Sequence, residues 1–367
     1  MAGKIRQPID EAALTKYLQE HVKEVETPIE LKQFGFGQSN PTYQIRSATG
    51  QRFVMRKKPP GKLVSQTAHQ VEREWRVMSA LHQTRVAVPK TYALCQDSGV
   101  IGTPFYVMEF LDGRIFQDMA MPEVGAGERE AMWRAAVEML AELHRVDVAR
   151  VGLTGFGRGD GFYDRQVKTW RTVCGKQEAV VDVESGVAVG RLPYFEELVG
   201  FFGDGRMQPR DRAGLVHGDY KIDNVVFAKT EPRVLGILDW EMSTIGHPLS
   251  DVCNLLMPFY LAQDATISRL SSSHAAMLPG RTPGLPPPPQ LLAWYARVSG
   301  YDAAPDLKWG MAFNLFKMAA VFQGIAARYA QRQASSAQAK QVGEMRRPTA
   351  ELAWKLAQEA GAPAARL

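Results

Sequence analysis

The chain has 367 residues, of which 45% are hydrophobic, and this length and composition are typical of a globular protein with two or three domains or lobes. Its 44 Lys and Arg residues against 39 Asp and Glu residues give a net charge of +5, which does not indicate a nucleic-acid-binding protein. Three widely separated cysteines argue against a disulfide framework and a zinc site, and the polar N-terminus and interrupted apolar stretches argue against export and a membrane span, so we expect a cytoplasmic protein.

The first part of the chain has the pattern of a small α+β unit. Apolar residues at helical spacing from Pro8 to Val25 predict an amphipathic helix, and we assign residues 1–27 to a helix that packs on the outside of the following lobe. Residues 28–110 are expected to form that lobe, because short β-type runs joined by Gly, Asn and Pro are typical of an antiparallel meander. A helix is expected from Ser65 to His82. Two more strands are expected at Lys90 to Cys95 and Thr103 to Phe110.

The remainder, residues 111–367, is predicted to be mainly helical. The clearest helix runs from Glu128 to Arg145. The proline-rich segment from Leu278 to Gln290 is interpreted as a stiff surface loop that leads into a helix, with a polyproline ligand as the alternative. We therefore predict an α+β fold, with a small antiparallel-sheet N-lobe followed by a larger helical C-lobe.

The most informative stretch is LVHGDYKIDNVVF, from Leu215 to Phe227, which is followed by ILDWE. Apolar runs on both sides predict strands, so the polar residues between them form one tight loop. In such a loop Asp219 can accept a proton from a hydroxyl group, and Asn224 and Asp239 can offer oxygen ligands to Mg²⁺. These parts suit phosphoryl transfer, although Asp and Asn are also common turn formers and each element alone would indicate only a turn.

Taken in order, HGDYKIDN and ILDWE resemble the catalytic and metal loops of the aminoglycoside phosphotransferase and choline kinase family, which is related to the protein kinases. The resemblance covers both lobes and implies a bilobal protein-kinase-like fold, ATP as phosphoryl donor and Mg²⁺ as cofactor. It implies that Asp219 is the catalytic base, that Asn224 and Asp239 bind the metal, and that His217 supports the loop. Asp223 has no counterpart among these roles, and we expect it to face solvent or to cap the turn.

The same family has a loop that covers the nucleotide phosphates, and FGFGQSNPTYQI lies at the corresponding place. Gly35 and Gly37 permit close approach of the backbone, while Ser39, Asn40 and Thr42 offer hydroxyl and amide donors. The segment lacks the full glycine pattern of protein kinases, so a simple hairpin turn is the alternative.

The next strand, FVMR, resembles the strand that carries the phosphate-contacting lysine of protein kinases. By this resemblance Val54 faces the adenine and Arg56 takes the place of the lysine. Lys57 is a rival shifted by one residue, but strand alternation favours Arg56 because it shares a face with Val54. Glu74 is expected to orient Arg56, with Glu72 as the alternative, since two residues apart on a helix they face different ways.

Two further segments match the family. FYVMEFLDG resembles the hinge between the lobes, where backbone groups of Glu109 and Leu111 bind the adenine edge and Met108 closes the pocket behind it. In GHPLSDVCNLL, Asp251 resembles the family's aspartate that begins a helix and supports the catalytic loop by accepting backbone N–H groups. Relatives often have an aspartate where this chain has His247.

The acceptor is expected to be a small molecule with a hydroxyl group. The segment from Val151 to Lys176 is rich in Arg and Lys, which favours a neutral or anionic acceptor over a cationic one. GQSNPTY, RKKPPG, RQVKTW and LDWEMSTIGHPLSD resemble the kinase-like domain associated with acyl-CoA dehydrogenases, which implies a hydroxyacyl-CoA acceptor and a functional link to such a dehydrogenase. An aminoglycoside or amino-alcohol kinase, and a nucleotide-binding scaffold without turnover, are the alternatives.

Overall fold

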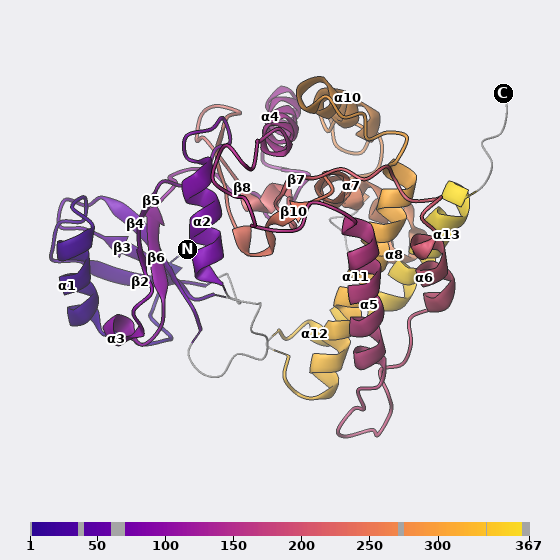
Figure 1. Ribbon diagram of the computed structural model, residues 1–367, viewed down its shortest axis with the longest axis horizontal. Coiled ribbons are helices and arrows are strands. Elements are labelled where there is room, and N and C mark those ends of the chain that lie inside the picture. The colour runs from indigo at the N-terminus through magenta and orange to yellow at the C-terminus, as the bar shows by residue number, and fades with distance from the viewer. Residues whose placement is uncertain (1, 36–39, 60–69, 271–274, 335, 362–367) are drawn as a thin grey trace.

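The computed structural model describes residues 2–35, 40–59, 70–270, 275–334 and 336–361. Figure 1 shows a sheet-containing N-lobe beside a larger helical C-lobe. The N-lobe sheet is antiparallel, with strand order β1-β2-β3-β4-β6-β5. Its strands are β1 (Ala2–Gly3), β2 (Glu30–Phe34), β3 (Thr42–Arg46), β4 (Arg52–Lys57), β5 (Thr91–Cys95) and β6 (Phe105–Glu109).

The side chains of β4 alternate between the two faces of this sheet, and each face packs against a helix. Phe53 and Met55 pack in a cluster with Leu14 of α1 (Glu11–His21), on the outer side of the lobe. Val54 faces the other way and belongs to the main core, which also includes Met78 of α2 (Val71–Leu81). A short helix, α3 (Ser98–Ile101), joins β5 to β6. The face that carries Val54 is therefore the face turned toward the C-lobe.

The C-lobe is mainly helical and contains two short strand pairs, β7 with β10 and β8 with β9. Its helices are α4 (Ala126–His144), α5 (Phe162–Glu178), α6 (Phe195–Gly203), α7 (Leu249–Gln263), α8 (Ala265–Leu270), α10 (Pro288–Ser299), α11 (Leu307–Ala330), α12 (Ala339–Glu344) and α13 (Arg346–Gly361). The strands are β7 (Gly214–Val216), β8 (Val225–Phe227), β9 (Val234–Ile237) and β10 (Thr244–Gly246), and the 3₁₀-helices are η1 (Ile222–Asn224) and η2 (Trp240–Met242). The predicted α+β class, with an antiparallel-sheet N-lobe and a mainly helical C-lobe, is confirmed.

Helix α11 is long and apolar enough to cross a membrane, but 67% of its most apolar 18-residue stretch is buried inside the structure. Its polar residue Gln323 is fully buried and donates from Nε2 to the carbonyl oxygen of Gly190 at 2.8 Å. A long apolar helix that is mostly buried and hydrogen-bonded to a neighbouring loop is typical of the core of a globular protein.

The connection from β6 to the C-lobe is held against β8. The backbone of Arg114 exchanges hydrogen bonds with Phe227, at 2.7 and 2.9 Å. A Cβ atom on Gly113 would lie only 2.3 Å from the carbonyl oxygen of Phe227, so this close approach requires glycine. The connection therefore joins the sheet of the N-lobe to the strand that follows the polar loop.

Candidate active site

A cavity of about 620 Å³ lies between the N-lobe sheet and the loops of the C-lobe. Its walls come from β4, β6, the connection after β6, η1 and the segment after β9. Many residues predicted for nucleotide and metal binding line it, namely Thr42, Val54, Arg56, Met108, Glu109, Leu111, Asn224 and Asp239. The fold thus brings together, in one cavity, residues that are far apart in the sequence.

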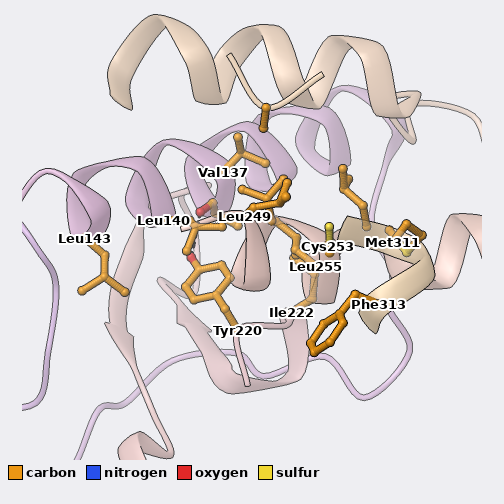
Figure 2. Packing of buried hydrophobic residues seen from close by; sticks show 14 of the residues in the cluster. Val137, Leu140, Leu143, Tyr220, Ile222, Leu249, Cys253, Leu255, Met311 and Phe313 are labelled. Carbon is orange, nitrogen blue, oxygen red and sulfur yellow. Dashed lines mark hydrogen bonds between the residues drawn. The ribbon is translucent and has the colours of Figure 1, made fainter. Parts of the chain in front are cut away.

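The polar loop between β7 and β8 is fixed to the core by two of its own side chains. Tyr220 and Ile222 lie in the hydrophobic cluster with residues of α7 and α11 (Figure 2). The Tyr220 hydroxyl donates to the carbonyl oxygen of Ala136 in α4 at 2.7 Å. Because these apolar residues alternate with the polar ones, the loop buries one set of side chains and leaves the other at the cavity.

Asp251, in the first turn of α7, supports the loop from below. Its carboxylate accepts the backbone N–H groups of His217 at 2.6 Å and Gly218 at 2.8 Å, and it lies 3.2 Å from Nε2 of His144. Burial acts to raise the pKa of Asp251, but hydrogen bonds from His144 and from the His217 backbone hold it below its ordinary value. The carboxylate is therefore charged and holds the loop, in the position that the sequence predicted.

His217 is fully buried and connects two parts of the site. Its Nε2 lies 2.9 Å from the carbonyl oxygen of Leu238, and its Nδ1 lies 3.3 Å from the backbone N–H of Asp219. A neutral ring that donates from Nε2 and accepts at Nδ1 satisfies both contacts. His217 thus links the Asp219 loop to the residue that precedes Asp239.

Asp219 and Asn224 are hydrogen-bonded to one another. Nδ2 of Asn224 donates to the Asp219 carbonyl oxygen at 2.9 Å and lies 3.2 Å from its carboxylate. Since the amide nitrogen is used in this way, Oδ1 is the atom that Asn224 can offer to a metal. A second amide, Asn254 of α7, lies 3.4 Å from the Asp219 carboxylate and donates to Tyr220. The sequence analysis missed Asn254, although it follows Asp251 by one helical turn.

Asp239 lies at the end of the apolar run of β9 with a left-handed backbone, φ 67°. Aspartate tolerates this conformation better than most residues. Its Oδ1 lies 2.8 Å from Nη2 of Arg56, which also lies 3.4 Å from a carboxylate oxygen of Glu241. Glu241, the last residue of ILDWE, is thus a second acidic neighbour of Arg56, and the sequence motifs did not indicate it.

Arg56 points into the cavity and is paired with Glu74. Nε of Arg56 lies 3.3 Å from Oε2 of Glu74, whose carboxylate also accepts the Tyr106 hydroxyl at 2.9 Å. Burial raises the pKa of Glu74 to about 7, although Arg56 acts in the opposite direction. The alternative Glu72 is paired with Lys58 at 2.6 Å instead. Arg56, rather than Lys57, shares the cavity wall with Val54, as alternation predicts.

The predicted phosphate-covering loop is only partly described. Gly37 and Ser39 lie outside the described residues. Asn40 does not have the expected place as a phosphate donor, because it is fully buried and donates from Nδ2 to Glu74 at 2.8 Å. Thr42 lines the cavity, and its hydroxyl donates to the Asn40 carbonyl oxygen. Gly35 has open space where a Cβ atom would lie.

The hinge residues Glu109 and Leu111 lie on the cavity wall. The backbone N–H of Glu109 donates to the Lys90 carbonyl oxygen at 2.8 Å. The Leu111 carbonyl oxygen accepts the N–H of Gly113, and in the described part of the chain the N–H of Leu111 has no hydrogen-bond partner. Met108, which is 8% exposed, lies on the cavity wall behind them. The hinge can therefore offer a free N–H donor from Leu111.

Asp223 is partly exposed, with 26% of its side chain accessible, and it also lines the cavity. Its carboxylate lies 3.2 Å from Nζ of Lys221. One of its oxygens, Oδ1, is buried without a hydrogen-bond partner among the described residues. Burial raises the pKa of Asp223, and Lys221 opposes this effect. The expectation that Asp223 faces solvent or caps the turn did not include this place on the cavity wall, to which the 3₁₀ turn η1 brings it.

The geometry agrees with comparisons to known proteins. A family described as the phosphotransferase enzyme family matches residues 30–270. The solved structure of a Ralstonia eutropha protein described as an aminoglycoside phosphotransferase is 35% identical, with a TM-score of 0.80 over 96% of this chain and 99% of that chain. A complex of APH(2")-IIa with streptomycin and ATP is 14% identical, with a TM-score of 0.56 over 96% of this chain and 98% of that chain, and shares the fold.

Curated relatives carry a different kind of name. Acyl-CoA dehydrogenase family member 10 of Mus musculus is 38% identical over 96% of this chain, and member 11 of Homo sapiens is 36% identical over 87%. Probable acyl-CoA dehydrogenase IBR3 of Arabidopsis thaliana is 38% identical over 89%. The chain spans only 32%, 39% and 40% of these relatives, respectively.

Proposed function

Because this chain belongs to the phosphotransferase enzyme family, we propose that it transfers the γ-phosphoryl group of ATP to a hydroxyl group of a small molecule. One observation supports this most strongly. The cavity that holds the hinge and Arg56 on one side holds Asn224 and Asp239 on the other, with Asp219 hydrogen-bonded to Asn224. These are the parts that position a nucleotide, a metal and an attacking hydroxyl.

The N-lobe side would bind the nucleotide. Val54 and Met108 offer apolar surface to the adenine ring, and the Leu111 N–H can donate to a ring nitrogen. Arg56 forms an ion pair with Glu74 and lies on the same wall, so its guanidinium can bind phosphate oxygens. In this proposal Arg56 exchanges part of its contact with Asp239 for the phosphates.

Asn224 and Asp239 are the residues that would hold Mg²⁺. Both offer oxygen atoms at the cavity wall, and Mg²⁺ in nucleotide sites is commonly held by one or two protein oxygens together with the phosphates. Within the described residues there is no cluster of three or more His, Cys, Asp or Glu side chains that would favour another kind of metal site. When bound, Mg²⁺ neutralises negative charge on the phosphates.

Asp219 would orient and deprotonate the acceptor. The hydroxyl oxygen attacks the γ-phosphorus, the bond from that phosphorus to the β–γ bridging oxygen breaks, and ADP leaves. The hydroxyl proton passes to the Asp219 carboxylate, which Asn224 and Asn254 hold in place. His217 and Asp251 do not touch the reactants in this scheme and act by fixing the loop.

For the acceptor we propose a hydroxyacyl-CoA or a similar anionic metabolite. The names of the curated relatives connect this domain with acyl-CoA dehydrogenases, and we propose a functional link to such an enzyme. Helix α5 supports this choice, because its exposed residues Lys168, Arg171 and Lys176 would repel a polycation. The alternative is an aminoglycoside or amino-alcohol kinase, since solved complexes of similar fold contain aminoglycosides.

An acceptor panel with ADP release as the readout tests this proposal. It compares hydroxyacyl-CoA thioesters with kanamycin and choline in the presence of Mg²⁺ and ATP. Turnover on kanamycin or choline, without turnover on any thioester, would refute the proposed acceptor. Calorimetry with Asp239→Ala tests the metal assignment, because this variant should bind Mg·ATP more weakly than the parent protein. Undiminished affinity would show that Asp239 does not hold the metal.

A further inference from the structure

A second, smaller cavity of about 80 Å³ lies on the other flank of the catalytic loop. The loop separates the two cavities, since Gly218 lines the small one while Asn224 lines the large one. The small cavity is bordered by α5, α11 and the segments around β10. Its walls include four aromatic residues, Phe162, Tyr163, Trp170 and Phe313, beside the uncharged polar residues Gln166, Thr244, Ser250 and Asn314.

One charged group stands out in this cavity. Among the residues that line it, all of them described, it is Lys317 of α11. Its Nζ lies 3.4 Å from the carbonyl oxygen of Gly218, the residue next to Asp219.

Lys317 is poorly satisfied where it lies. An ammonium group has three N–H donors, and the structure shows one long contact to a neutral oxygen. Burial lowers the pKa of Lys317, and Asp251 and Asp219 act in the opposite direction. An oxygen acceptor brought into this cavity would find the Lys317 Nζ as a hydrogen-bond donor close to the Asp219 loop.

We propose that Lys317 is the specificity-determining residue for the acceptor, and that its Nζ binds a carbonyl or carboxylate oxygen of the substrate near the hydroxyl that is phosphorylated. The aromatic side chains of the cavity take the short apolar segment beside that oxygen. This inference rests on the proposed phosphotransferase function and narrows its acceptor class to hydroxylated acyl compounds.

The dimensions and charge of the cavity support this class. A volume of about 80 Å³ admits only a short part of a substrate, so the rest must extend outward past Met242, which lines the cavity and is 54% exposed. A protonated amine would meet the Lys317 ammonium here, and a like charge in an apolar cavity is repelled strongly. Aminoglycosides and choline are therefore disfavoured by the same residue that favours an acyl oxygen.

Calorimetric titration in the presence of Mg²⁺ and a non-hydrolysable ATP analogue tests the inference. The probe is 3-hydroxybutyryl-CoA, and the variants are Lys317→Met and Lys317→Arg. Lys308→Met is the matched control, because Lys308 is an exposed lysine of the same helix. We expect Lys317→Met to weaken binding of the thioester at least about tenfold and Lys317→Arg to restore part of the loss. Affinity for the ATP analogue should not change.

The outcomes separate this inference from the proposed function. Unchanged thioester affinity in Lys317→Met, or no binding of the thioester by the parent protein, overturns the inference. If the parent protein binds the thioester through Lys317 but transfers no phosphate to it, the proposed reaction fails while the inference stands. If phosphate is transferred and Lys317→Met binds the thioester normally, the reaction stands and the inference is wrong. Unfolding temperatures of all variants control for misfolding.

Discussion

Replacing Asp251 with Asn should uncouple the catalytic loop from the core. The wild-type carboxylate accepts two backbone N–H groups, at 2.6 and 2.8 Å, and both of its oxygens are used. An amide has one oxygen and one NH₂ group, so one of these buried N–H groups loses its partner and faces another donor. A buried unsatisfied donor costs about 1–3 kcal/mol, and the loss of a charged acceptor adds to this cost. We therefore expect a loss of about 2–4 kcal/mol in the free energy of unfolding.

Chemical denaturation of wild type and Asp251→Asn at pH 7 measures this difference, and steady-state kinetics should show a lower kcat. The pKa of Asp251 is lowered in the folded state, so its contribution is full above the unfolded-state value of 3.8 and is lost as the pH falls through the folded pKa. The gap between the two proteins should therefore shrink below pH 3.8. Asp160→Asn, at an exposed carboxylate, is the control and should change stability by less than about 0.5 kcal/mol. A gap below about 1 kcal/mol at pH 7 with normal kcat would refute the supporting role.

Three further substitutions, one of them paired with a control, test the site. Asp219→Asn should lower kcat about 10²–10⁴-fold with little effect on ATP affinity, measured by ADP release and calorimetry, and an unchanged kcat would exclude Asp219 as the base. Arg56→Met should weaken ATP binding about tenfold or more, whereas Lys57→Met should not; equal losses by calorimetry would contradict the assigned strand face. Gly218→Ala should lower the unfolding temperature, because φ is +87° and a Cβ atom would lie 2.5 Å from the Met242 carbonyl oxygen, and a normal unfolding temperature would show that the loop can shift.

The fold class and much of the site follow from local sequence patterns. Strand alternation placed Val54 and Arg56 on the cavity wall, and an ordered motif placed Asn224 and Asp239 there, with Asp219 hydrogen-bonded to Asn224. These predictions needed only neighbouring residues and the resemblance to one family. The sequence did not decide whether Glu72 or Glu74 of α2 pairs with Arg56, because this depends on which of the two side chains points toward β4.

The residues that the sequence analysis missed make contacts over long sequence separations. His144 meets Asp251 from α4, at a separation of 107 residues, and no local pattern indicates such a pairing. Lys317 lies in a mainly apolar helix, and a lysine in such a helix would ordinarily be interpreted as a surface residue. Asn40 was assigned to phosphate binding from its place in a loop, whereas its burial against Glu74 depends on how α2 packs on the sheet. Packing, which sequence periodicity does not encode, decided these cases.

The most direct test of the central claim is a phosphate-transfer measurement with hydroxyacyl-CoA thioesters as acceptors. Wild type and Asp219→Asn are incubated with ATP and Mg²⁺, and the thioester is followed by mass spectrometry while ADP is quantified. We predict that the thioester gains one phosphate for each ADP released. This product should depend on Mg²⁺ and should be nearly absent with Asp219→Asn. Phosphorylation of only kanamycin or choline, or equal product formation by Asp219→Asn, would contradict it.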